Sequence, residues 1–225
     1  MDKQLEQLKL RLEDSVEAID VHQEAQELTK LFAHSEVFTF KTNPQPCFQD
    51  FTDSVRSARW RNVRVLHLTG HGGSKCGFFW LKNPEVSTTE YDNEISIDKF
   101  ANILSSEVGG GQGKGTIECV VLNACETEPM GKKLRSVGLL HVVCWRSEVQ
   151  DVTAKRFALD FYASLKDQGQ ARDYKLAFQQ AVVRMSEKNH LGKCKSKKYL
   201  HADAVDYVCL LSQDGDEFPD TGHIR

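Results

Sequence analysis

Two side chains capable of nucleophilic chemistry lie where apolar segments give way to small residues. His71 lies between Gly70 and Gly72 within residues 66–73, LHLTGHGG. Cys125 occupies a similar place in residues 120–127, VVLNACET. Because glycine permits tight turns and close backbone approach, a strand that ends in this way presents a reactive side chain with little steric cover. The two segments therefore predict a dyad in which an imidazole activates a thiol.

The spacing of the two residues supports the dyad. His71 precedes Cys125 by 54 positions, and a His about 50 residues upstream of a nucleophilic Cys is typical of caspase-type proteases. Taken singly, each residue has a simpler interpretation, Cys125 as a buried thiol and His71 as a loop residue. Their joint position at strand ends favours the dyad.

A catalytic Cys125 needs a thiolate, since a free thiol has a pKa of about 8.5. Unpaired backbone N–H groups before a helix, together with His71, would favour negative charge on the sulfur. The negative charges of Glu126 and Glu128 disfavour a thiolate at Cys125, and we expect their carboxylates to point to solvent or toward substrate. The backbone N–H groups of Gly72 and Cys125 are the candidate oxyanion hole. A simple tight turn at Gly72 is compatible with that role.

The elements around these motifs alternate between helix and strand, which indicates an α/β fold with a parallel sheet. Helices are predicted at residues 20–33, 48–60, 96–107, 129–136, 152–166 and 174–188, and strands at 36–41, 63–69, 117–123, 139–145 and 207–211, with a hairpin arm at 78–81. Residues 1–19 fit a helix or a first strand, and their charges favour helix.

Composition limits the class of protein. The 225 residues are 40% hydrophobic, enough for one compact domain, and the net charge of −3 argues against a nucleic-acid partner. Seven cysteines without a Cys-x-x-Cys pair suggest neither a disulfide framework nor a metal site and fit a reducing, cytoplasmic setting. No apolar stretch approaches 18 residues, so we expect neither a secretory signal nor a membrane span.

Three further features have simple interpretations. The glycine-rich residues 109–116 do not fit a phosphate-binding loop, because the glycine register fails and the segment leads from helix to strand; we expect a mobile connector. The lysine-rich residues 188–198 read as a solvated loop more than as a site for an acidic partner. His67 reads as a packed histidine, because no second metal ligand stands at usable spacing.

Residues 67–72, HLTGHG, and 122–127, LNACET, resemble the two signature motifs of CHAT domains, which are caspase-like domains related to separase. The resemblance continues through residues 137–145, 149–151 and 154–162. It implies a caspase-like three-layer α/β sandwich with a mostly parallel sheet of about six strands flanked by helices. The domain would span residues 20–212, between the N-terminal segment 1–19 and a polar tail, 213–225.

The resemblance also implies cysteine endopeptidase chemistry on a protein substrate, with His71 as general base, Cys125 as nucleophile and no cofactor or metal. It places the substrate pocket after the strand that ends near Trp145. Arg146 would pair there with an acidic substrate side chain, whereas Asp151 would favour a basic one. Asp151 has an alternative role as the N-cap of the following helix.

A second function remains open on the sequence. The alternative is a catalytically silent CHAT-like interaction or signalling module, which the brevity of the chain favours, because we recognise in it no sensor segment to control a protease. In that case residues 1–19 would dock a regulatory protein. The intact pair of His71 and Cys125 favours the enzyme.

Overall fold

A four-stranded sheet forms the centre of the protein. The computed structural model describes residues 21–42, 48–58, 61–73, 77–79, 94–108, 115–188 and 207–216. The sheet contains β1 (Val65–Thr69), β5 (Cys119–Asn123), β6 (His141–Trp145) and β7 (Val208–Ser212) in the order β1-β5-β6-β7. β5 pairs in parallel with β1 and β6, whereas β7 runs antiparallel to β6. The carboxyl ends of β1, β5 and β6 therefore meet at one edge.

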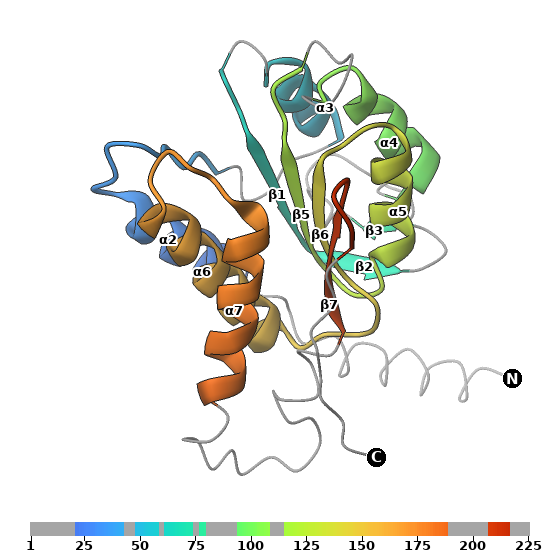
Figure 1. The fold of residues 1–225 in the computed structure, drawn as a ribbon. Coiled ribbons are helices and arrows are strands. Elements are labelled where there is room, and N and C mark those ends of the chain that lie inside the picture. Colours follow the sequence, from blue (N-terminus) through green and yellow to red (C-terminus); the bar gives the residue numbers. More distant parts are fainter. Residues whose placement is uncertain are drawn as a thin grey trace, which may run out of the picture.

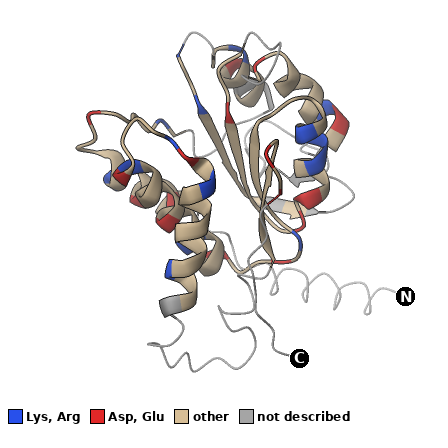
Figure 2. Cartoon of the chain, viewed as in Figure 1, with Lys and Arg blue, Asp and Glu red and all other residues tan. Residues whose placement is uncertain are grey.

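Helices cover both faces of this sheet (Figure 1). One face carries α2 (Val21–Phe32), α6 (Asp151–Asp167) and α7 (Tyr174–Lys188), and the other carries α3 (Phe48–Arg56), α4 (Ile97–Ser105) and α5 (Glu128–Ser136). A strand covered on both faces is apolar throughout, and β5 and β7 are buried at every position. The charged residues of both signs lie mainly on the helices (Figure 2).

Two hydrophobic clusters follow from the alternation of side chains along each strand. Val120 and Val142 face the cluster under α4 and α5, together with Phe100. Val121 and Val143 face the opposite cluster, which includes the aromatic residues of α6. The sheet is thus held from both sides, and its strand ends are fixed relative to each other.

A smaller antiparallel sheet follows directly on β1. It consists of β2 (His71–Gly73), β3 (Gly77–Phe79) and β4 (Glu94–Ile95) in that order, with His71 paired to Phe79. Residues 78–79 of the predicted hairpin arm lie in β3, and residues 80–81 lie outside the described residues. The turn after β1 therefore places the backbone of His71 in a strand and not in a loop.

One predicted strand is wrong. Residues 36–41 form no strand, although Phe38 and Phe40 alternate as a strand would. Both rings pack instead on Phe32 of α2, with ring centroids 5.7 and 6.0 Å apart. The Phe38 N–H donates to Ser35 Oγ at 3.0 Å, so this backbone group has a local partner in place of a neighbouring strand.

The other predictions for the described elements agree to within a few residues; for example, the helices expected at 152–166 and 174–188 are confirmed as α6 and α7. The described residues have a mixed α/β fold whose central sheet has four mostly parallel strands, and the expected sheet of about six strands is not confirmed. The predictions for residues 1–19 and 109–114, and for most of 188–198, lie outside the described residues. None of the described helices is long and apolar enough to cross a membrane.

Candidate active site

The two predicted catalytic residues follow neighbouring strand ends. Thr69 and Asn123, the last residues of β1 and β5, are direct partners in the parallel register. His71 and Cys125 each come two residues later. In an open sheet with parallel strands, loops at the carboxyl edge are the usual place for a functional site.

Gly72 brings the backbone of β2 against the turn that contains Cys125. A Cβ atom built on Gly72 would lie 2.4 Å from the Cys125 carbonyl oxygen and 3.0 Å from the Ala124 Cβ. Only glycine permits this approach without a shift of the backbone. The backbones of His71 and Cys125 are thereby placed close together. The His71 imidazole lies outside the described part of the structure, and the oxyanion roles of Gly72 and Cys125 stay predictions.

The turn after β5 is braced by a buried hydroxyl. Glu126 adopts a positive φ of 52°, and Thr127, 1% exposed, donates from Oγ1 to the Ala124 carbonyl at 3.0 Å. The same oxygen accepts the Trp145 N–H at 3.1 Å. Thr127 therefore closes the turn on itself and attaches it to the end of β6.

The segment after β6 lies against the Cys125 thiol. The Val149 N–H donates to Cys125 Sγ at 3.3 Å, and the Glu126 N–H donates to the Ser147 carbonyl at 3.1 Å. The thiol is half-buried as a result. Val149 thus contacts the sulfur through its backbone groups, and Ser147 holds the neighbouring residue of the turn.

The surroundings of Cys125 oppose formation of a thiolate. Burial raises the pKa of the Cys125 thiol, the Val149 N–H lowers it, and the carboxylates of Glu148, Asp151 and Glu126 raise it further. The net direction is upward, because a buried anion loses hydration and nearby like charges repel it. These neighbours act against the thiolate, and the expected support from His71 and from backbone N–H groups stays a prediction.

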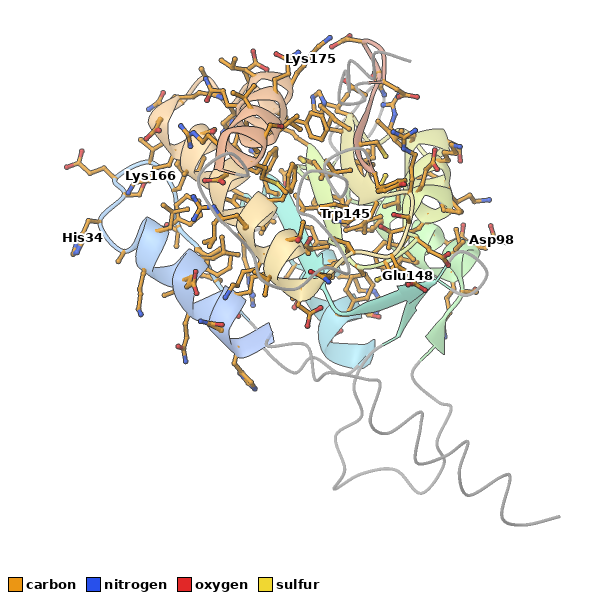
Figure 3. The ribbon with its side chains drawn as sticks, turned by 90° about the horizontal axis from the view of Figure 1, so that it is seen from below. His34, Asp98, Trp145, Glu148, Lys166 and Lys175 are labelled. Carbon is orange, nitrogen blue, oxygen red and sulfur yellow. The ribbon has the colours of Figure 1, made fainter. Side chains whose placement is uncertain are left out.

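The two candidate pocket residues lie at opposite ends of residues 146–151. Arg146 follows β6 directly, has an exposed side chain, and donates its N–H to the Tyr207 carbonyl at 2.8 Å. Asp151 is the first residue of α6, and the N-cap is Gln150. The alternative role of Asp151 as N-cap is thus wrong by one residue. Its charge still lies in the first helical turn, where the helix dipole favours an anion. Figure 3 views this edge of the molecule, with Trp145 in the interior and Glu148 nearer the periphery.

Sequence reasoning missed a buried carboxylate next to the site. Glu24 of α2 is 4% exposed, and its Oε1 lies 3.0 Å from His67 Nε2. His67 is packed, as predicted, but in a polar contact. The sequence signal was present in β1, where His67 and Thr69 interrupt apolar residues on one face. Their partner on α2 lies more than 40 positions away and has no local signature. Among the described residues, no group of three or more His, Cys, Asp or Glu is arranged to hold a metal.

The sequence model of the CHAT domain family matches residues 6–203. The chain belongs to the CHAT domain family. It is also similar to a protein named Roc-COR-CHAT protease from an unknown prokaryotic organism, with 28% identity over 101 residues. That alignment covers 45% of this chain and 9% of the relative, so the chain spans less than a tenth of the relative's length. The resemblance inferred from the two motifs is therefore confirmed at the level of the family.

Proposed function

We propose that this CHAT domain is a caspase-like cysteine endopeptidase, with Cys125 as nucleophile and His71 as general base. The contact of Gly72 with the Cys125 carbonyl carries the proposal, because it supports a reacting geometry for the neighbouring His71. Membership of the CHAT family and the similarity to a protein named as a protease agree with this class of enzyme. Helices on both faces of the sheet support a caspase-like sandwich.

The reaction would proceed through an acyl-enzyme. Cys125 Sγ attacks the peptide carbonyl carbon while His71 takes the thiol proton. The N–H groups of Gly72 and Cys125 stabilise the resulting oxyanion. The C–N bond then breaks, and His71 returns its proton to the leaving amine. A water molecule, deprotonated by His71, hydrolyses the thioester and releases the acid product and the thiol.

The charges around the thiol support a basic side chain in the substrate. The negative charges of Glu126, Glu148 and Asp151 all raise the pKa of the Cys125 thiol. A Lys or Arg side chain bound among them would offset their repulsion of the thiolate, so that substrate binding lowers the pKa of the nucleophile. Of the two candidates in residues 146–151, we therefore assign substrate recognition to Asp151, assisted by Glu148, and not to Arg146.

A catalytically silent interaction module is the second candidate. The raised pKa of Cys125 favours it, since a neutral thiol held by the Val149 N–H is a poor nucleophile. In such a module Cys125 would serve only to pack the turn after β5. A partner would then bind wild-type protein and Cys125→Ala alike.

Capture of new protein N-termini from a cell lysate distinguishes the two functions. The lysate is treated with wild-type protein, Cys125→Ala or Cys125→Ser in parallel. We expect new termini with wild type alone, preceded in the uncleaved sequence by Lys or Arg. Termini of equal abundance with Cys125→Ala would remove Cys125 as nucleophile. Termini preceded by Asp or Glu would show that Arg146, and not Asp151, recognises the substrate side chain.

A further inference from the structure

A buried polar cluster, here called the Glu24 network, lies directly behind the candidate site. Its centre is the Glu24 carboxylate, whose Oε1 contacts His67 Nε2 at 3.0 Å and accepts from Asn123 Nδ2 at 2.8 Å. Its Oε2 accepts from Thr69 Oγ1 at 2.8 Å. The Trp145 indole N–H donates to Asn123 Oδ1 at 3.1 Å. Glu24 thus connects the ends of β1 and β5 directly, and Asn123 extends the network to the end of β6.

Each of these strand ends leads to a part of the site. Thr69 ends β1, two residues before His71, and Asn123 ends β5, two residues before Cys125. Trp145 ends β6, four residues before Val149, whose N–H contacts the thiol. The network therefore lies where each of these three segments leaves the sheet. Movement of any one strand end would shift its segment relative to the other two.

The contacts of Glu24 are more numerous than packing of α2 requires. A buried carboxylate is costly unless several donors compensate for its lost hydration. Glu24 has three such partners on two strands, and His67 is itself held at Nδ1 by the Tyr162 hydroxyl at 3.1 Å. An apolar residue would join α2 to the sheet equally well, as Leu28 does one turn later at 1% exposure. An apolar side chain would not fix three polar groups at set distances.

We propose that Glu24 is a positioning residue for the reaction centre, which holds the ends of β1, β5 and β6 in the mutual arrangement that His71, Cys125 and Val149 require. Its catalytic consequence rests on the proposed peptidase function. Its structural consequence, control of the Cys125 environment, does not. Glu24 itself touches no reacting atom.

Two variants of the network test the proposal against one matched control. Glu24→Gln keeps the shape of the side chain and removes its charge. Thr69→Val removes one donor with almost no change in volume and keeps the test valid if Glu24→Gln fails to fold. Glu27→Gln is the control, because Glu27 lies on the same helix and pairs only peripherally with Lys155 at 3.3 Å.

The first readout is the rate of alkylation of individual cysteines by iodoacetamide, followed by peptide mass spectrometry. Cys119 begins the strand that Cys125 follows and is 0% exposed, so it serves as an internal reference for global unfolding. Local loosening of the strand ends raises the Cys125 rate alone, whereas unfolding raises both rates together. We expect the ratio of the Cys125 rate to the Cys119 rate to rise about tenfold in Glu24→Gln.

The second readout is peptide cleavage by the whole chain. Misplacement of reacting groups lowers kcat by about tenfold to a hundredfold while KM changes by less, because the reacting atoms tolerate smaller displacements than the substrate contacts proposed for residues 146–151. The proposal would be overturned if activity fell only in proportion to the amount of folded protein while the ratio of the Cys125 and Cys119 alkylation rates stayed unchanged in both network variants. Glu24 would then be a structural residue only.

The two proposals fail in different ways. If wild-type protein cleaves no peptide, the proposed function fails, and the ratio of alkylation rates still decides the role of Glu24. If wild type cleaves peptides and both network variants match Glu27→Gln in kcat and in the rate ratio, the function stands and the positioning role is wrong.

Discussion

At the scale of single residues, the state of the Cys125 thiol decides whether the site can react. The sulfur is half-buried and accepts a hydrogen bond from the Val149 N–H. The negative charges of nearby carboxylates also act on it. Each of these features except the N–H group favours the neutral thiol. These neighbours of Cys125 therefore favour the neutral thiol over the thiolate.

The pH dependence of Cys125 alkylation should show this directly. Because burial and neighbouring carboxylates raise the pKa of Cys125, the alkylation rate should still increase above pH of about 8.5, the pKa of a free cysteine. Glu148→Gln removes one repelling charge, lowers the pKa and should increase the rate at pH 7.5 about threefold. Rates are measured by mass spectrometry of the Cys125 peptide between pH 6 and pH 10.

Asp167→Asn is the control for that experiment, since Asp167 ends the same helix that Asp151 begins and its side chain is 70% exposed. It should leave the Cys125 profile unchanged. A wild-type rate that levels off near pH 7, or an effect of Asp167→Asn equal to that of Glu148→Gln, would contradict an acidic environment at the thiol.

At the scale of elements, the contact between β2 and the turn after β5 builds the site. β2 continues the chain from β1 but belongs to the smaller antiparallel sheet. Its approach to the Cys125 turn depends on the missing side chain of Gly72. Thr127 fixes the other side of the turn to β6. The turn is therefore held between two sheets.

Gly72→Ala should separate these elements. The added Cβ would meet the Cys125 carbonyl oxygen at 2.4 Å and Thr127 Cγ2 at 3.0 Å, so the backbone must shift. We expect a loss of about 1–3 kcal/mol in the free energy of unfolding. Peptide cleavage should fall about a hundredfold. Urea denaturation and steady-state kinetics measure the two effects.

Gly169→Asn is the matched glycine control. Gly169 has a φ of 62°, which asparagine tolerates, and a Cβ there would meet nothing within 4 Å. It should change stability by less than about 0.5 kcal/mol. Full activity in a folded Gly72→Ala protein would show that close approach of β2 is dispensable.

At the scale of the whole molecule, the Glu24 network joins α2 to the sheet through charge as well as through packing. Burial alone would raise the pKa of the Glu24 carboxyl, but His67, Thr69 and Asn123 outweigh it and lower the pKa below its ordinary value. The carboxylate is therefore the form that the folded chain favours. This preference couples the stability of the fold to pH.

The sign of that coupling predicts acid sensitivity. With a folded pKa below the unfolded one, Glu24 stabilises the fold above about pH 4.5, and this stability is lost as pH falls through the folded pKa. Urea denaturation between pH 3 and pH 7 should show a smaller decrease toward acid for Glu24→Gln than for wild type. Equal pH slopes in the two proteins would show that Glu24 does not titrate as described, and Glu27→Gln should retain the wild-type slope.

Local patterns were sufficient to predict much of the molecule. Periodic apolar residues predicted α6 and α7, and continuous apolar runs predicted β5 and β6, because these elements bury residues that are close in sequence. The segments around His71 and Cys125 indicated the family for the same reason, since each motif is contiguous. The false strand at 36–41 arose because alternation describes burial of Phe38 and Phe40 but does not supply a neighbouring strand.

What the sequence by itself determined was the order of helices and strands, the family and the pair His71 and Cys125 as candidates. Only the tertiary structure decided that the Val149 N–H contacts the thiol, that Glu148 and Asp151 add to the effect of Glu126 on its pKa, and that Glu24 joins the ends of β1 and β5. The physical reason is the range of the interactions. Periodicity and turn chemistry act within a few residues, whereas hydrogen bonds and charges act between groups that the fold brings together from distant parts of the chain.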